Sequence, residues 1–228
     1  MTLNKKLPKA VIFDWDNTLV DTWPLIQVAI DTTMEQMGKE PWGLEKVKNE
    51  VHASMRESFP KIFGDNWEKA GEIYKKSYRE NHLDKLVFLP GATQLLDKLL
   101  ELNITLIIIS NKIGTTLRKE AGHMGVSDKF FSIVGSTDAA RDKPHKEPVD
   151  LALQNSELDP KRDLIWFVGD TITDVECAAI SECQPVLYGE GRNVPKDLIV
   201  KLKKDPNKPI LCFDDHFGIV KHIEECSQ

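Results

Sequence analysis

Short runs of consecutive apolar residues recur along the chain and alternate with stretches whose apolar residues repeat at helical spacing. Val11, Ile12 and Phe13 form the first run, which is typical of a buried parallel strand. Later runs predict strands at 104–109, 130–134, 164–168, 185–188 and 209–213, and helical spacing predicts helices near 90–102, 115–124, 147–157, 173–182 and from about 215. This alternation predicts right-handed βαβ units and a doubly wound, Rossmann-like parallel sheet of the α/β class.

The segment from about residue 20 to 85 has a different pattern, with helix after helix and no convincing strand. A helix is predicted over 23–37, and a long one over 65–82. Between them, a single helix is predicted to carry Leu44, Val47, Val51 and Met55 on one face, followed by a turn or helix fragment at 58–64. We therefore expect an α/β core domain formed by 1–20 and 86–228, with an all-helical domain inserted at 21–85.

Composition and charge narrow the range of functions. The 228 residues carry a formal net charge of −6 and no run of basic residues, which argues against nucleic-acid binding. Lysines gather near the C-terminus, but acidic residues and prolines interrupt them, and we interpret them as a solvated face. The four cysteines lack zinc-type spacing, and no apolar run approaches the length of a membrane span. We expect a cytoplasmic protein with reduced thiols and no membrane partner.

Polar side chains follow three of the predicted strands, and a lysine lies in the loop after another. They are Asp14 and Asp16, Ser110 and Asn111, Asp170 and Asp174, and Lys143. The carboxyl ends of parallel strands form the edge where open α/β sheets bind ligands. Carboxylates that lie close together cost free energy unless a cation or a shared proton relieves them.

Each of these residues also has a simple structural explanation when it is taken alone. Asp16 or Asn17, and the Ser110–Asn111 pair, could be helix N-caps. Asp170 and Asp174 could begin a helix, and Lys143 could be a surface residue. Independent caps need not all fall at strand ends in this order, so the set as a whole favours a functional site.

The chemistry that needs such a set is phosphoryl transfer through an aspartyl phosphate. A carboxylate that attacks a phosphate dianion meets charge repulsion, which a hard cation with oxygen ligands reduces. Four aspartates against one lysine, Lys143, would repel the substrate, so we expect activity to require Mg²⁺. Lys143 can serve as a point charge on the phosphate, and Ser110 and Asn111 can donate hydrogen bonds to it.

These residues closely resemble the four motifs of the haloacid dehalogenase-like (HAD) superfamily. The matching segments are Asp14-Trp-Asp16-Asn-Thr18, Ser110-Asn111-Lys112, Lys143-Pro144 and Gly169-Asp170-Thr-Ile-Thr-Asp174. They occur in the order that the superfamily shows, and the resemblance covers nearly the whole chain.

The resemblance implies a role for each motif residue. Asp14 would be the nucleophile, and Asp16 the general acid for the leaving group and then the general base for water. Asp16 also separates the phosphatases of this superfamily from its dehalogenases, which lack an acid there. Thr18 would orient the Asp14–Asp16 loop. Mg²⁺ would be held by Asp14, the backbone carbonyl of Asp16 and Asp170, with Asp174 directly behind or beside them.

The inserted helices resemble the C1 cap of the superfamily, with a length and placement similar to those of its phosphoglycolate phosphatase-like branch. That branch often has K-P-x-P at the third motif, whereas this chain has Lys143-Pro144-His145-Lys146. Lys146 is therefore an alternative to Lys143. Candidates for substrate selection in the cap are Trp23, Arg56 and Arg79, with Trp42 and His52 as weaker ones.

The resemblance implies a Mg²⁺-dependent phosphatase that acts on a small phosphorylated metabolite, as a monomer or homodimer. Two alternatives stay open. A sugar-phosphate mutase of the same superfamily would use the same motifs and return the phosphoryl group to its substrate. A signalling receiver domain also forms a phospho-aspartate, but it has no inserted helices and no acid at the position of Asp16.

Overall fold

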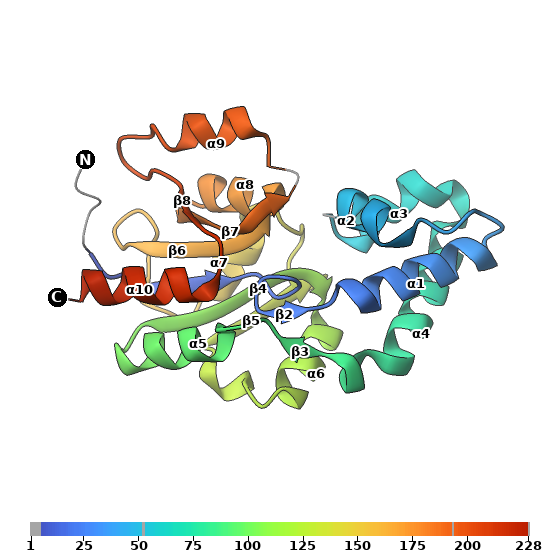
Figure 1. Cartoon of the computed structure of the whole chain (residues 1–228), viewed down its shortest axis with the longest axis horizontal. Helices are drawn as coiled ribbons and strands as arrows, with labels where there is room; N and C mark the ends of the chain where they lie inside the picture. The colour runs from blue at the N-terminus through green and yellow to red at the C-terminus, as the bar shows by residue number, and fades with distance from the viewer. Residues whose placement is uncertain (1–5, 52, 193, 228) are drawn as a thin grey trace.

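The computed structural model describes residues 6–51, 53–192 and 194–227, and a parallel sheet forms its centre (Figure 1). The strand order is β5-β4-β1-β6-β7-β8. The strands are β1 (Ala10–Phe13), β4 (Thr105–Ile113), β5 (Ser132–Ser136), β6 (Ile165–Thr171), β7 (Gln184–Arg192) and β8 (Leu211–Phe213). In the centre, Phe13 is in register with Ile108 of β4 and Val168 of β6. This arrangement confirms the predicted α/β class with a Rossmann-like parallel sheet.

Helices cover both faces of the sheet because successive residues of a strand point to opposite sides. Val11 and Phe13 pack in one apolar cluster with α5 (Ala92–Glu101), α6 (Gly114–His123) and α10 (His216–Cys226). Ala10 and Ile12 pack in a second cluster with α7 (Glu147–Leu153) and α8 (Ile172–Ile180). The central strand is thus buried on both faces, as its unbroken apolar run predicts.

Four further helices lie beside the sheet, on the right of Figure 1. They are α1 (Trp23–Gln36), α2 (Gly43–Glu50), α3 (Met55–Phe63) and α4 (Trp67–Lys85), with the short η1 (Gly64–Asn66) before α4. We call α1–α4 the cap segment. The chain enters it through β2 (Val20–Asp21) and leaves it through β3 (Val87–Phe88), which pair with each other in antiparallel fashion. The entry and exit of the cap segment therefore lie side by side.

Several predicted boundaries are wrong. The helix expected to carry both Val51 and Met55 is two helices: α2 ends at Glu50, Val51 is extended, and α3 begins at Met55. The segment expected to be a turn or helix fragment lies mostly within α3. β4 runs on to Ile113, and β2 is a short strand where none was expected.

The C-terminal part of the chain contains α9 (Lys196–Leu202), a helix that was not predicted from the sequence. Earlier in the chain, η2 (Ser127–Lys129) is a short 3-10 turn. The apolar residues of α9 pack against β7, since Leu198 and Leu202 lie against the cluster of Leu187. All four cysteines lie within the described residues and are thiols, not disulfides. Within the described residues, no helix has both the length and the apolar character needed to cross a bilayer.

Candidate active site

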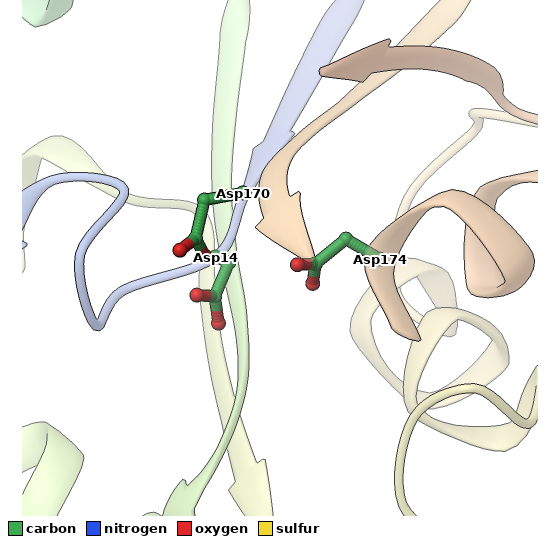
Figure 2. A group of neighbouring side chains, drawn as sticks. All are labelled: Asp14, Asp170 and Asp174. Atoms are coloured by element: carbon green, nitrogen blue, oxygen red, sulfur yellow. The ribbon is translucent and has the colours of Figure 1, made fainter. Parts of the chain in front are cut away.

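Three aspartates bring their carboxylates together at the carboxyl edge of the sheet (Figure 2). Asp14 follows β1, Asp170 lies near the end of the neighbouring β6, and Asp174 is in the first turn of α8. One oxygen of each carboxylate lies within 4.8 Å of the other two, and all three residues are buried. Residues far apart in the sequence thus form one acidic cluster that could hold a metal ion.

The cluster carries more negative charge than its surroundings offset. Burial raises the pKa of Asp14 to about 7, and Asp174 and Asp16 add to the rise while Lys143 opposes it. Burial, together with Asp14 and Asp174, also holds the pKa of Asp170 well above its ordinary value. Carboxyl groups whose charged forms are disfavoured in this way are those that a bound cation would stabilise.

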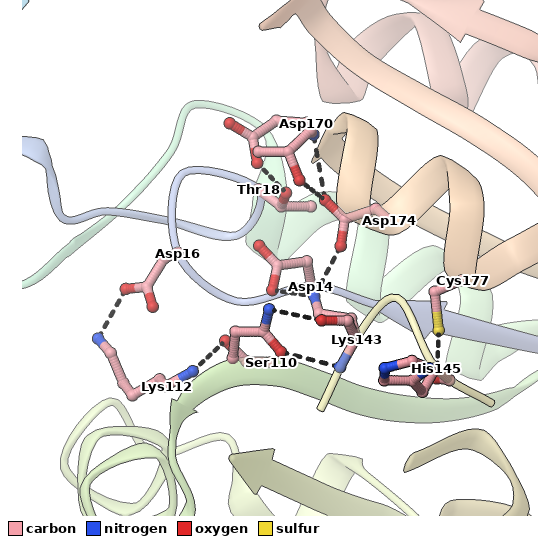
Figure 3. A network of polar contacts seen from close by, with 12 residues as sticks. Asp14, Asp16, Thr18, Ser110, Lys112, Lys143, His145, Asp170, Asp174 and Cys177 are labelled. Atoms are coloured by element: carbon pink, nitrogen blue, oxygen red, sulfur yellow. Dashed lines mark hydrogen bonds and ion pairs between the residues drawn. The ribbon is translucent and has the colours of Figure 1, made fainter. Parts of the chain in front are cut away.

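Lys143 is buried among these carboxylates and is 2 % exposed. Its Nζ lies 2.7 Å from Oδ1 of Asp14 and 2.6 Å from Oδ1 of Asp174 (Figure 3). Burial alone would lower the pKa of Lys143, but the two carboxylates outweigh it and raise this pKa above its ordinary value. Lys146 instead pairs with Asp150 on the surface. Lys143, and not Lys146, therefore lies at the acidic cluster.

Asn111 fixes the backbone of Lys143. Its Nδ2 donates to the carbonyl oxygen of Lys143 and its Oδ1 accepts from the amide of Lys143, each at 3.1 Å. Ser110, also buried, accepts a hydrogen bond from the amide of Lys112. Both residues lie within β4 and line the same cavity as Lys143. The second and third sequence motifs therefore meet at the site.

Thr18 and Asp174 connect the acidic cluster to the backbone around it. The hydroxyl of Thr18 donates to Oδ1 of Asp170 at 3.4 Å. Asp174 forms a capping box with Thr171 at the start of α8, and its other oxygen faces Lys143. Asp174 thus helps to begin α8, as the simple structural explanation holds, and it also belongs to the acidic cluster, because one oxygen contacts Thr171 and the other contacts Lys143.

The alternative explanation as N-caps is wrong for Asp16, Asn17 and the Ser110–Asn111 pair. The N-cap positions of α1 and α6 are Thr22 and Ile113, so neither Asn17 nor the Ser110–Asn111 pair caps a helix. Asn17 has a φ of 60° and accepts a hydrogen bond from the amide of Thr22. Its role is to shape the turn that follows β1.

Asp16 points away from the three clustered carboxylates (Figure 3). Its Oδ1 forms an ion pair of 2.6 Å with Nζ of Lys112. Lys112 in turn contacts Glu120 of α6 and Tyr78 of α4. Sequence reasoning missed Glu120 and Tyr78; a charged residue on the apolar face of a predicted helix was the available signal for Glu120.

A cavity of about 150 Å³ lies between the acidic cluster and the cap segment. We call the charged and polar residues on the core side of this cavity its floor. They are Asp14, Asp16, Ser110, Asn111, Lys112, Lys143, Asp170 and Asp174. Its roof consists mainly of apolar and aromatic side chains from α1, α3 and α4, namely Ile26, Ile30, Phe59, Ile62, Tyr74 and Tyr78. The charged floor can act on an anionic group, while the roof surrounds whatever that group is attached to.

The cap candidates of the sequence analysis have different positions. Trp23 and Arg79 line the cavity. Arg56 instead makes two hydrogen bonds of 2.6 Å to the carboxylate of Asp142, the residue before Lys143. Trp42 packs against the apolar core and a lysine side chain, and His52 lies outside the described residues.

A parallel sheet with an acidic cluster at its carboxyl edge, and with helices over that edge, defines the class of α/β proteins with a covered ligand site. The family model for haloacid dehalogenase-like hydrolases matches residues 11–187. The chain belongs to this family, which confirms the resemblance drawn from its motifs.

Individual relatives agree with this assignment. A phosphoglycolate phosphatase of Chromobacterium violaceum is 30% identical over 198 residues, which cover 83% of this chain and 88% of that protein. A HAD-superfamily hydrolase of Ehrlichia chaffeensis has 32% identity and a TM-score of 0.64, covering 98% of this chain and 99% of its own. A haloacid dehalogenase-like family protein of Streptococcus pneumoniae has 22% identity and a TM-score of 0.79, covering 96% and 99%, and this likeness supports the fold.

Proposed function

We propose that the chain is a Mg²⁺-dependent phosphatase that hydrolyses a small phosphate monoester, of the phosphoglycolate type, through an aspartyl phosphate. The observation that carries the proposal is the burial of Lys143 among three carboxylates beside a cavity. Such a site combines a nucleophile, a cation for the phosphate and candidate metal ligands. Relatives that are named phosphoglycolate phosphatase support the substrate class.

The donor set fits Mg²⁺, which prefers carboxylate, carbonyl and water oxygens. Asp14 and Asp170 would hold it, with the backbone carbonyl of Asp16, and Asp174 would lie beside them. When bound, the ion supplies positive charge that reduces the repulsion between the phosphate dianion and the carboxylates. Such an ion would oppose the burial and the carboxylate repulsion that raise the pKa values of Asp14 and Asp170.

The proposed chemical steps use the roles that the family resemblance implies for Asp14 and Asp16. An oxygen of Asp14 attacks phosphorus, the ester P–O bond breaks, and Asp16 gives a proton to the departing oxygen. A water molecule then attacks phosphorus and gives a proton to Asp16, and the P–O bond to Asp14 breaks to release phosphate. Thr18 would keep the loop between the two aspartates in position through Asp170.

Three residues of the floor would bind the phosphoryl oxygens. Lys143 supplies the charge, Ser110 a hydroxyl, and Asn111 the second N–H of an amide that already holds the backbone of Lys143. Residues 21–85 would act as a cap domain on a core formed by 1–20 and 86–228, and close over the substrate. A cytoplasmic location, a small phosphorylated metabolite as partner, and a monomer or homodimer complete the proposal.

The test is a screen of phosphorylated metabolites with Mg²⁺ that measures phosphate release, with Asp14→Asn as the control. We expect the parent to release phosphate and the variant to lose on the order of 10³-fold or more of this activity, as for other lost nucleophiles. An equally active variant would contradict the proposal. Isomerised substrate without free phosphate would indicate a mutase, and a stable phosphoprotein without turnover would indicate a receiver.

A further inference from the structure

We infer that Lys112 is a positioning residue for Asp16, and that Tyr78 makes this positioning depend on the cap segment. The inference rests on the proposed function, because it concerns the residue that exchanges a proton with the leaving group and with water. Lys112, Asp16 and Tyr78 all line the cavity. The network that joins them is drawn in part in Figure 3.

The ammonium group of Lys112 has three partners that fix its position. Its Nζ lies 2.6 Å from Oδ1 of Asp16, 2.7 Å from Oε2 of Glu120 and 2.7 Å from Oη of Tyr78. An ammonium group has three N–H donors, so these contacts use its full capacity. The Lys112 side chain is only 7% exposed, and it therefore has little freedom to move without breaking one of them.

Glu120 holds Lys112 from the core side. It is fully buried on α6, and its Oε2 also accepts a hydrogen bond of 2.8 Å from the indole nitrogen of Trp15. Trp15 lies between the two aspartates of the first motif and is itself fully buried. The same carboxylate oxygen thus fixes both Lys112 and the turn that carries Asp16. A buried pair of this kind is costly to desolvate, and removing one partner leaves the other charge uncompensated.

The ion pair with Lys112 is what fixes one oxygen of Asp16. Within the described residues, Oδ1 of Asp16 is buried and accepts no hydrogen bond, so the ion pair with Lys112 is the polar contact that holds it. Contact at Oδ1 leaves the other carboxylate oxygen to exchange a proton with the leaving group or with water. Lys112 therefore sets the direction in which Asp16 faces the substrate.

Tyr78 brings the cap segment into this arrangement. It lies on α4, whereas Lys112 and Glu120 belong to the core. Besides the hydrogen bond to its hydroxyl, the Lys112 ammonium lies 4.8 Å from the centre of the Tyr78 ring. Withdrawal of the cap segment would remove both contacts and loosen Lys112. Proton transfer by Asp16 would then be efficient only when the site is covered, which limits attack by stray water.

The test compares two phosphate esters that differ in leaving group. p-Nitrophenolate departs without a proton, whereas the alkoxide of benzyl phosphate needs one. The ratio of kcat/KM for benzyl phosphate to kcat/KM for p-nitrophenyl phosphate therefore reports on the general acid. In Lys112→Met we expect this ratio to fall by about 10- to 100-fold, within the range that positioned acids contribute. In Tyr78→Phe, which keeps the ring, we expect a fall of about fivefold, as for one lost hydrogen bond.

A second readout uses the later step. Water attack still needs Asp16 as base, so Lys112→Met should give a burst of p-nitrophenolate equal to the enzyme concentration, followed by slow turnover. The double variant Lys112→Met/Glu120→Gln removes both buried charges and keeps the test possible if Lys112→Met fails to fold. Lys98→Met changes a half-buried lysine of α5 that pairs with Glu101. It is the matched control and should behave as the parent.

The outcomes separate this inference from the proposed function. Equal losses with both esters and no burst, in a folded variant, would overturn the positioning role of Lys112 while leaving the phosphatase assignment intact. An unchanged ratio in Tyr78→Phe would overturn the link to the cap segment. Failure of the parent to release phosphate from any ester, including those of the screen, would instead count against the proposed function itself.

Discussion

The floor and the roof of the cavity are built in different ways. The floor consists of charged and polar residues at the ends of parallel strands, and each is fixed by a contact to backbone or to another charged group. The roof consists of helical side chains, and Phe59, Tyr74 and Tyr78 form a row of contacting rings. The sheet thus positions the reacting groups, whereas packing among the helices of the cap segment shapes the space for the rest of the substrate.

The two regions meet at charged contacts close to the reacting groups. Arg56 of α3 binds Asp142, which precedes Lys143, and Tyr78 of α4 binds Lys112, which faces Asp16. In each case, a residue of the cap segment contacts a residue that adjoins or pairs with a residue of the proposed mechanism. Covering the cavity and arranging its floor should therefore be coupled, and substitutions can test each side separately.

Apart from the loss of the nucleophile in Asp14→Asn, the largest effect is expected on the floor, from Lys143→Met. The substitution removes the only lysine at the acidic cluster among the described residues, and with it the charge that would bind the phosphate. We expect kcat/KM for phosphate release to fall by about 10² to 10³-fold, as when one electrostatic stabiliser is lost. Lys146→Met changes a neighbouring lysine outside the site and should leave kcat/KM unchanged. Comparable losses in both variants would remove the distinction between them.

The contact between floor and roof is tested by Arg56→Gln. The side chain of Arg56 is about one-third exposed, whereas that of Asp142 is buried, so the variant weakens the link and leaves a buried carboxylate with other donors, Ser136 and Thr137. We expect kcat/KM to fall about 10-fold through less frequent closure of the cap segment. Faster cleavage by trypsin near residues 83–90 would report the opening directly.

Arg118→Gln is the matched control for this prediction. Arg118 also makes a two-point contact with an aspartate, Asp138, but both residues belong to the core. Kinetics and cleavage close to those of the parent are expected. A loss of activity as large as that of Arg56→Gln would show that general destabilisation, and not opening, explains the result.

The pH dependence of stability tests the charge balance of the floor. The pKa of Asp14 is raised from 3.8 to about 7 in the folded protein, so ionisation favours the unfolded chain. Without metal, the neutral carboxyl of Asp14 therefore favours the folded protein. This contribution to the free energy of unfolding is present below about pH 4 and is lost as the pH rises toward 7. Bound Mg²⁺ should restore it, so the rise in Tm on adding Mg²⁺ should be larger near pH 8 than near pH 5.

Differential scanning fluorimetry with EDTA or excess Mg²⁺ measures this difference. Asp14→Asn removes one titrating group of the cluster and should flatten the pH dependence of the metal-free protein. An equal Mg²⁺ effect at both pH values would mean that the ion binds elsewhere. The floor would then lack the charge conflict that its buried carboxylates indicate.

The floor could be predicted from the sequence because simple rules connect it to the pattern. Asp14 and Asp170 follow buried strands, and parallel strands end at a common edge. The contacts of Glu120 and Arg56 could not be predicted, because their partners, Lys112 and Asp142, come from elements whose relative orientation depends on packing. Asp174 shows a second limit. The sequence presented a role at the start of a helix and a role in the site as alternatives, whereas in the structure Asp174 has both.

The roof should give the smallest effects, and Ile62→Ala tests it. Ile62 is a partly buried residue of α3 that lines the cavity, and its truncation enlarges the roof without touching a charged group. We expect kcat for a saturating ester to change less than about twofold and KM to change by about 3- to 10-fold, since each buried methylene-sized group contributes about 0.8 kcal/mol, or about fourfold in binding. The preference should move toward bulkier esters because the added space can hold them. A matched loss of kcat for small and bulky esters would mean that the roof, like the floor, positions the reacting groups.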